Sequence, residues 1–257
     1  MRTLQATTTP SRSWRGLGSF LMAAALLCLG DVARAQDAVG AVIHLSGLTT
    51  ARRDDGATRL LAARSVIHEG ETLVTEADTY MEIRFVDDAT LVLGPASRVQ
   101  VTRYSWNPEH PEADRVVLEL LGGSLRSETG RLGKRNHEAI VIKVPDGEIA
   151  VHGTTFLAMA VAAPGGGGAP VPMPATTMQP GLYVQVIDGL INVSNRGGST
   201  NFSAGQFGYT ASVKQPPVVL PANPGIQFTP PPAFNQSTGP GATQSGSKAA
   251  AVDCEVR

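Results

Sequence analysis

Cysteine and aromatic residues are scarce in this chain, and the scarcity of cysteine limits how the fold can be stabilised. The 257-residue sequence contains two cysteines, Cys28 and Cys254, and aromatic side chains make up 5% of it. Cys28 lies in an apolar N-terminal run that we expect to be removed, so only Cys254 would remain. An internal disulfide is then impossible, even in an oxidising compartment. We therefore expect an apolar core alone to stabilise the fold, with Cys254 an incidental exposed thiol rather than a link to another chain.

Charge of one sign does not accumulate either. The chain carries 21 basic and 22 acidic side chains, for a formal net charge of −1. Removal of the N-terminal segment would take away four arginines and one aspartate, which leaves a formal charge of −4. Such mild acidity offers no basic surface for nucleic acid or for an anionic membrane. We therefore expect no nucleic-acid partner.

A hydrophobic run of the roughly 20 residues that span a membrane is also missing. The longest apolar run, Leu17 to Leu29, follows three arginines, and Ala33-Arg34-Ala35 then provides a small-x-small cleavage pattern. This combination is typical of a secretory signal peptide. A retained N-terminal anchor is the alternative, and the leucine before Cys28 disfavours a lipoprotein. We expect cleavage after Ala35, a periplasmic or secreted protein, and no transmembrane segment after cleavage.

Residue patterns that carry catalysis or bind metals are absent as well. The histidines are His44, His68, His110, His137 and His152, and they lack the spacings of zinc sites. Asp87-Asp88 lacks the alternating oxygen ligands of a calcium loop, so we expect a solvated turn there. Gly165 to Gly168 lacks the lysine and hydroxyl residue of a phosphate-binding loop. No nucleophile elbow accompanies His152, which we interpret as a surface or half-buried strand residue.

These absences lead to one prediction about chemistry. A nucleophile needs a base within hydrogen-bond reach and a third group that orients the base. The sequence shows no pattern that would bring three such groups together. We therefore predict that the protein is not an enzyme, and we assign no catalytic, cofactor-binding or metal-binding residues and no cofactor.

The sequence does contain many short runs in which β-branched or aliphatic residues alternate with polar ones. In Thr79 to Phe85 we expect Met81, Ile83 and Phe85 to point into a core, and the charged residues between them, such as Glu82, to point outward. Glycine, proline and aspartate separate these runs at intervals close to those of β-sandwiches, barrels and solenoids. The chain is therefore predicted to be all-β.

The longest patterned run, Ile140 to Phe156, is the expected centre of the fold. It predicts a strand, a tight turn at Pro145-Asp146-Gly147 and a second strand. Gly153 interrupts the second strand, where a bulge or a close backbone approach is expected. Further on, Asp188-Gly189 lies between two aliphatic runs and predicts the turn of a hairpin over Leu182 to Val193.

The remaining segments set the predicted domain organisation. A signal peptide over residues 1–35 precedes one β domain over residues 38–212, a twisted β-sandwich or β-solenoid-like stack with negligible helix. Within it we expect an exposed loop over 127–138 and a flexible, glycine- and proline-rich insertion over 162–181. A disordered Pro/Gly-rich tail should follow over 213–257. Since such a tail contributes no core, deletion of residues 215–257 should leave the melting temperature nearly unchanged.

The order of these pieces over about residues 38–210 resembles the FecR domain, the periplasmic module of bacterial iron-transport regulators. The segments that carry the resemblance are Gly40 to Gly47, Gly70 to Thr75, Met81 to Ser97, Gly123-Ser124-Leu125, Val144 to Phe156, Val186 to Val193 and Ala204-Gly205-Gln206. Each motif is weak alone, and their order is more specific. The acidic turn departs from the family pattern, because Asp88 stands where the family usually has glycine.

The resemblance implies an exported, non-catalytic interaction or signalling module of the cell envelope, whose most natural partner is another envelope protein. The family's regulators join this domain to a cytoplasmic anti-sigma segment and a membrane span, which a cleavable signal replaces here, so their transmembrane signalling is not carried over. A carbohydrate- or cell-wall-binding domain is the alternative and would need a groove lined by aromatic residues, which a 5% aromatic content disfavours. A hydrolase would need convergent acid, base and nucleophile in a pocket.

Overall fold

We analysed a computed structural model of the full chain, which describes residues 38–162 and 178–235. The regular secondary structure of the described part is almost entirely β-strand, as predicted. The expected signal peptide and nearly all of the expected flexible insertion lie outside the described residues. Among the residues that are described, no helix has the length and apolarity needed to cross a membrane.

Residues 38–162 and 178–235 contain fifteen strands and three short helical segments. In chain order the elements are β1 (Ala38–Ser46), β2 (Thr49–Arg52), β3 (Thr58–Leu60), β4 (Val66–His68), β5 (Thr72–Thr75), β6 (Tyr80–Phe85), β7 (Thr90–Leu93), β8 (Arg98–Ser105), η2 (Pro111–Ala113), β9 (Arg115–Glu128), α2 (Arg131–Arg135), β10 (Ile140–Val144), β11 (Gly147–Val161), β12 (Gly181–Asn195), β13 (Gly198–Ser203), β14 (Phe207–Thr210), β15 (Val218–Leu220) and η3 (Pro232–Asn235). The predicted strand, turn and strand of the central run are β10, the turn and β11.

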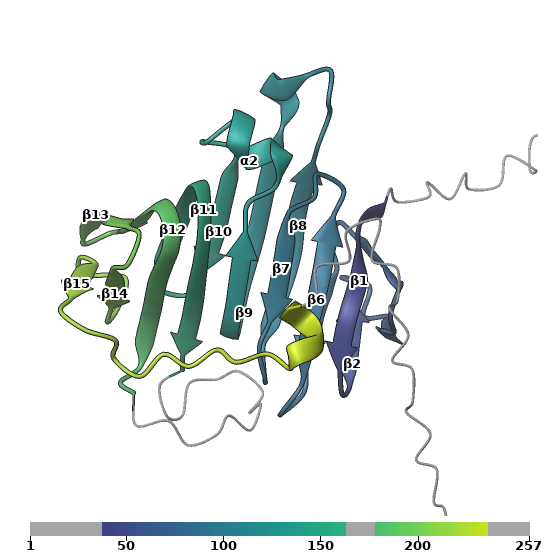
Figure 1. Ribbon diagram of the computed structural model, residues 1–257, viewed down its shortest axis with the longest axis horizontal. Coiled ribbons are helices and arrows are strands. Elements are labelled where there is room, and N and C mark those ends of the chain that lie inside the picture. The colour runs from purple at the N-terminus through teal and green to yellow at the C-terminus, as the bar shows by residue number, and fades with distance from the viewer. Residues whose placement is uncertain (1–37, 163–177, 236–257) are drawn as a thin grey trace, which may run out of the picture. The chain divides into compact units, whose positions relative to one another are not determined.

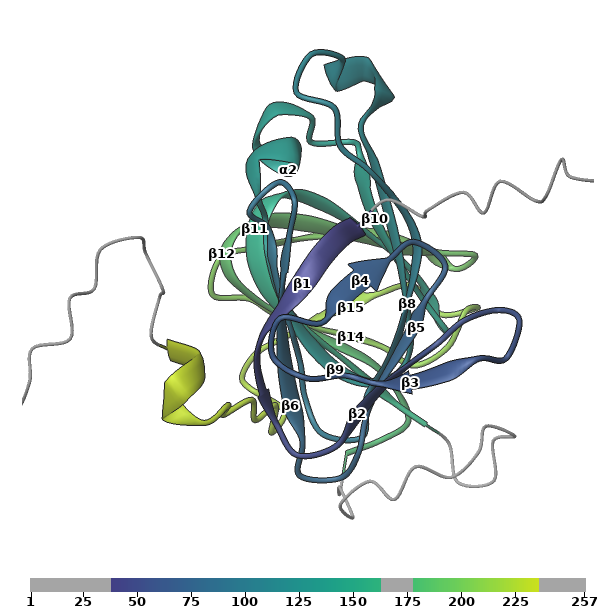
Figure 2. The same cartoon turned by 90° about the vertical axis from the view of Figure 1, so that its right-hand side faces the viewer.

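All the strands belong to one sheet, which folds over itself into two layers (Figures 1 and 2). The first layer runs β15-β14-β12-β11-β9-β7-β6-β1-β4. The second runs β13-β12-β11-β10-β9-β8-β5-β2-β3. Three long strands, β9, β11 and β12, take part in both layers, so each must bend where it passes from one to the other. Bulges and glycines commonly make such bends.

The bend of β11 and β12 lies where the sequence placed two glycine signals. His152 pairs with Leu190, whereas Thr155 pairs with Asp188, so the register slips between them. Both glycines have positive φ, +67° at Gly153 and +84° at Gly189. A Cβ atom at Gly189 would lie 2.7 Å from the carbonyl oxygen of Gly153. The bulge predicted at Gly153 is confirmed, but the predicted hairpin is wrong: β12 runs through Asp188-Gly189 as one bent strand.

Buried hydroxyl groups fasten the long strands near these bends. The Thr154 hydroxyl donates to the Leu190 carbonyl at 2.5 Å and accepts from the Leu190 N–H at 3.1 Å. The Thr129 hydroxyl contacts Thr154 in the same way, at 2.9 Å in each direction. At the bend of β9, the Ser97 hydroxyl donates to the Ser124 carbonyl at 2.9 Å and accepts from the Ser124 N–H at 2.8 Å. Each hydroxyl satisfies backbone groups that the bend removes from the regular ladder.

The main core lies between the two layers and draws on nearly every strand. Met81, Ile83 and Phe85 are buried in it, which confirms the alternation predicted for β6. Glu82 points away from this core as expected, yet it is only 8% exposed. Its carboxylate lies 2.9 Å from the His44 ring nitrogen. The surface of the first layer that faces away from the core, hereafter the outer face, is therefore partly covered.

The acidic turn after β6 is not the solvated turn that the sequence predicted. Asp87 is fully buried and accepts hydrogen bonds from the Tyr104 hydroxyl at 2.5 Å and the Leu132 N–H at 3.1 Å. Burial raises the pKa of Tyr104 strongly, and the nearby Asp87 carboxylate raises it further. Of the two aspartates in this turn, only Asp88 is exposed. The reason for the difference is non-local: the partners of Asp87 come from β8 and α2.

The predicted exposed loop over 127–138 also contains more structure than expected. It includes the end of β9 and the five-residue helix α2. Leu132 of α2 is fully buried and belongs to the main core. A single apolar residue among charged neighbours gives no periodic signal, so the helix could not be recognised from the pattern.

The segment expected to begin the disordered tail is ordered up to Asn235. β15 pairs with β14, and the next residues lead across the outer face to η3 (Figure 1). Ile226 is 6% exposed and packs in a second apolar cluster on that face. We call residues 221–235 the strap. The prediction of disorder is thus wrong for residues 213–235, and residues 236–257 lie outside the described part.

Candidate interaction surfaces

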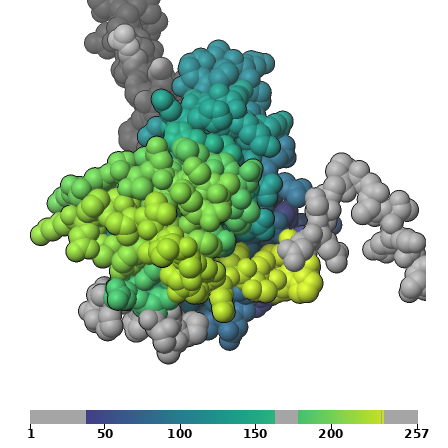
Figure 3. Space-filling view, turned by 60° about the vertical axis from the view of Figure 1, so that its left-hand side comes forward, coloured from purple at the N-terminus to yellow at the C-terminus, as the bar shows by residue number. Residues whose placement is uncertain are grey.

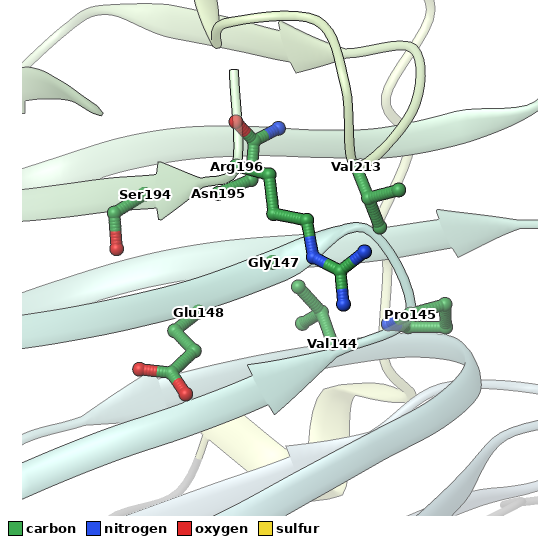
Figure 4. Close-up of a pocket in the computed structure, with 8 residues that line it drawn as sticks. All are labelled: Val144, Pro145, Gly147, Glu148, Ser194, Asn195, Arg196 and Val213. Atoms are coloured by element: carbon green, nitrogen blue, oxygen red, sulfur yellow. The ribbon is translucent and has the colours of Figure 1, made fainter. Parts of the chain in front are cut away.

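The hollow shown in Figure 4 lies where two turns approach each other. It has a volume of about 510 Å³ and is lined by Val144, Pro145, Gly147, Glu148, Ser194, Asn195, Arg196 and Val213. The β10–β11 turn forms one wall and the end of β12 forms another. The two backbones are close, because a Cβ atom at Gly147 would lie 2.3 Å from the Ser194 carbonyl oxygen. The hollow is thus built by backbone packing.

One polar side chain of this hollow, that of Asn195, satisfies backbone groups of the neighbouring turns. The Asn195 side chain accepts from the N–H groups of Gly197 and Gly198 and donates to the carbonyls of Ser212 and Gln215. No aromatic residue lines the hollow. It therefore lacks the flat apolar platform on which sugar rings commonly stack, and carbohydrate binding stays a prediction that this hollow does not support.

The histidines do not build a reaction centre in the described part of the chain. His44 contacts Glu82 and the ring of Phe234, whereas His110 pairs with the nearby, exposed Glu112. His152 is half-buried on β11, as predicted. Among the described residues no three histidine, cysteine or acidic side chains are grouped to hold a metal ion. The structure thus adds no catalytic or metal-binding candidate to a sequence that offered none.

A first candidate surface is the end of the sheet formed by β3 and β4. Within the described residues each of these strands pairs with one neighbour only, β3 with β2 and β4 with β1. Leu60 of β3 is 68% exposed, Leu48 is 52% exposed and Val66 of β4 is 40% exposed. Arg59 donates to the Val66 carbonyl, so β3 and β4 lie close together. We call this end, where β3 and β4 are labelled in Figure 2, the β3–β4 end. It presents aliphatic side chains to solvent.

Beneath that end, a buried ion pair fixes the β2–β3 hairpin. The Glu71 carboxylate is fully buried and accepts from Arg59 at 2.8 Å, while Arg53 lies 3.7 Å away. It also accepts from the His68 N–H at 3.1 Å. Charge-assisted bonds of this kind hold a short hairpin rigidly. The exposed leucine of β3 is thus presented on a fixed support rather than on a loose loop.

A second candidate surface is the outer face, which is occupied by the strap. The apolar cluster there contains Leu157, Val161 and Tyr183 of the sheet together with Ile226 of the strap. Burial raises the pKa of the Tyr183 hydroxyl, and the neighbouring Tyr209 raises it further. Phe228 packs edge-on against Tyr80, with ring centroids 5.8 Å apart. Figure 3 shows the strap as a yellow band on the surface.

Comparison with known proteins gives one family match and several weak structural likenesses. The FecR protein family matches residues 71–171. Two crystal structures of a protein provisionally assigned as an anti-sigma factor from Parabacteroides distasonis align with 10% identity and TM-scores of 0.41 and 0.42, over 58% of this chain and 58% of that chain. A cell surface anchoring domain aligns with 33% identity and a TM-score of 0.24, over 25% of this chain and 84% of that chain. The curated proteins contain no match.

The sequence match is more informative than the structural likenesses, which are weak and span less than two thirds of the first neighbours' length. It begins after β3 and β4 and covers β5 to β11, which includes the acidic turn, β9 and the bent strand β11. It is shorter than the resemblance predicted from the sequence, which extended over about residues 38–210. The family likeness of this chain is therefore to the FecR protein family, over residues 71–171.

Proposed function

We propose that this protein is exported and acts without catalysis, as an interaction or signalling module of the cell envelope. The FecR match supports the regulatory class. The observation that carries the proposal is the β3–β4 end, where Leu60 is 68% exposed on a strand with a single partner.

The chemistry of that end fits a protein partner better than a small ligand. Terminal strands with free backbone groups and exposed aliphatic side chains readily accept another protein surface or strand. The exposed leucine is held by the Arg59–Glu71 pair, so a partner would not have to order it on binding. The partner is expected to be another envelope protein that offers an apolar patch or an extended segment.

Export is tested by expressing the full chain and determining the N-terminus of the protein recovered from the periplasm or medium. We expect it to begin at Gln36. Recovery of uncleaved protein from the membrane fraction would favour the retained anchor instead. Recovery from the cytoplasm alone would contradict the proposal.

The interaction is tested by placing a photo-crosslinking amino acid at Leu60 and, as a matched control, at Lys143, an exposed position on β10. Irradiation of intact cells should give a discrete protein adduct from position 60 and none from position 143. The adduct should disappear when Val66→Asp is added. Absence of any adduct at position 60 of a correctly exported protein would contradict this surface.

A further inference from the structure

We infer that the outer face is a docking groove for an extended apolar peptide, that the strap fills it in cis, and that a segment of the partner replaces the strap. This inference rests on the proposed interaction function and specifies the chemistry of the partner. The groove lies on the first layer, over β12, β11, β9, β7 and β6. It is separate from the β3–β4 end, so the two can be tested independently.

The strap is seated on the groove in the manner of a bound peptide. Its residues alternate in exposure, since Ile226 is buried and Phe228 half-buried, whereas Gln227 and Thr229 are exposed. This alternation is the pattern of an extended segment with one side against a surface. Prolines at positions 221, 224 and 230–232 favour the extended backbone. Over Ile226 to Thr229 the strap therefore presents alternate side chains to the sheet without forming a strand.

Three apolar anchors of the strap enter defined sites on the sheet. Ile226 packs among Leu157, Val161 and Tyr183. Phe228 contacts the ring of Tyr80 and lies over Gly94, where a Cβ atom would be 3.1 Å from its ring. The absence of a side chain at position 94 makes room for this ring.

Phe234 is the third anchor and lies farthest along the groove. Its ring centroid is 5.6 Å from that of His44 and 6.3 Å from that of Tyr80. Glu82 beneath it holds the imidazole ring at 2.9 Å. The groove thus selects an aliphatic residue, an aromatic residue two positions later, and a second aromatic residue six positions after that.

The strap is held by side-chain burial alone. Among the described residues no hydrogen bond joins residues 221–235 to the rest of the domain. The bonds within the strap are local, such as those of the Asn223 side chain to Gly225 and Ile226. A segment that lacks backbone bonds to the sheet opens at a lower free energy than the strands beneath it.

The strap also leaves one donor of the outer face unsatisfied. Arg126 pairs across the strands with Val92 and Leu157, and its Nε atom is buried without a hydrogen-bond partner in the described part of the chain. An unpaired buried donor costs free energy that an incoming acceptor would recover. A partner segment that carries a carbonyl or carboxylate over Arg126 would bind this face better than the strap does.

The experiment measures binding of a fluorescein-labelled synthetic peptide with the sequence of residues 221–235 to three forms of the full chain. The first is the wild type. In the second, Phe228→Ala and Phe234→Ala release the strap. In the third, Gln227→Ala and Thr229→Ala change two exposed strap residues and serve as the matched control. Circular dichroism and thermal melting establish that each form is folded.

We expect the strap-released form to bind the peptide. The wild type and the control should bind it more weakly by a factor of at least roughly ten, because a tethered strap competes at millimolar effective concentration. A peptide with alanine at both phenylalanine positions should not bind. Equal binding by all three forms, or no binding by a folded strap-released form, would overturn the inference. Loss of folding in that form would overturn it as well, because the strap would then be an obligatory part of the fold.

Three further outcomes distinguish this inference from related explanations. A wild-type dimer that dissociates in the strap-released form would assign the groove to the strap of a second copy and overturn the inference of a different partner. Crosslinks at position 60 with no peptide binding would leave the proposed function standing while the groove fails. Peptide binding without crosslinks at position 60 would support the groove and contradict the β3–β4 end as an interaction surface.

Discussion

At the scale of single residues, hydroxyl groups hold this fold together where its strands bend. Thr154 is 2% exposed, and its hydroxyl both donates to and accepts from the backbone of Leu190. A bulge removes backbone groups from the ladder, so a side chain must satisfy them. This role explains why threonine follows Gly153 here, within a motif that the FecR resemblance singled out.

Replacing the hydroxyl with a methyl group tests this role. Thr154→Val keeps the size and β-branching but leaves the Leu190 N–H and carbonyl without their partner, so we expect the free energy of unfolding to fall by about 1–3 kcal/mol. The neighbouring Thr155→Val is the control. Its hydroxyl has no hydrogen bond in the described structure, and its change should stay within about 0.5 kcal/mol. Equal effects in urea denaturation would contradict the role of the Thr154 hydroxyl.

The acidic turn offers a second test at a single position. Asp88 has φ +66°, in the left-handed region that glycine adopts without strain. The sequence departs from the family pattern here, yet the backbone keeps the conformation that glycine would favour. Asp88→Gly should therefore change stability by less than about 1 kcal/mol, since it loses only an exposed ion pair with Arg131.

A β-branched residue at the same position should behave differently. Asp88→Val removes the same ion pair but forces a branched side chain into the left-handed region, at a cost of about 1–2 kcal/mol. Thermal melting of the two variants side by side checks this difference. If valine is tolerated as well as glycine, the turn does not require the conformation seen here.

Asp146 in the β10–β11 turn gives an expectation for pH dependence. Burial raises the pKa of this carboxyl group. Because its pKa is higher in the folded state, the Asp146 carboxyl group contributes its full stability at low pH, below the unfolded-state pKa. This contribution is lost as the pH rises through the folded-state pKa. Asp146→Asn should therefore be more stable than the wild type at pH 7, and the difference should vanish near pH 3. A difference that is constant with pH would show that charge is not its cause.

At the scale of elements, the sequence predicted the strands and turns that neighbouring residues determine. It did not predict features that depend on contacts between distant residues. The alternation in β6 and the turn between β10 and β11 are local, and both were recognised. Asp188-Gly189 has the chemistry of a hairpin turn, but the same residues serve a bulge when another strand runs alongside. Because β12 pairs with strands of both layers, these residues form a bulge and not a turn. No local sequence pattern distinguishes the two.

The candidate surfaces could be predicted less well than the strands. Exposure of Leu60 depends on β3 being the last strand of its layer, which is a property of the topology. The strap was missed because its prolines and glycine exclude a regular element, and composition does not reveal a bound extended segment. Its anchors, Ile226 and Phe228, have an i, i+2 spacing that would have been the one available signal.

Deletion of residues 215–257 tests the strap at this scale, and the expectation from sequence alone is reversed. Removal would expose Leu157, Val161 and Tyr183, which are at most 9% exposed in the complete chain. At about 25 cal/mol per Å² of apolar surface, several such side chains amount to roughly 2–4 kcal/mol. We expect a lower melting temperature with the main core intact, because that core contains no strap residue. An unchanged melting temperature would mean that the strap is not docked in solution.

At the scale of the whole described domain, the bent strands couple the two layers. The strands β9, β11 and β12 run through both layers. Neither layer can therefore separate from the other without breaking strand pairings within that layer. Native-state hydrogen exchange should therefore show the slowest amides of β7 and of β10 opening at the same free energy, whereas β15 opens at a lower one. Distinct free energies for the two layers would indicate two independent cooperative units instead.

The contact between Phe234 and His44 brings the last described helical segment against the first strand. His44 is the seventh of the nine residues of β1, so η3 lies toward the end of that strand remote from Ala38. The strap therefore spans the first layer from β15 at one end to β1 near the other. Its detachment would free the last described segment from the strand with which the described domain begins.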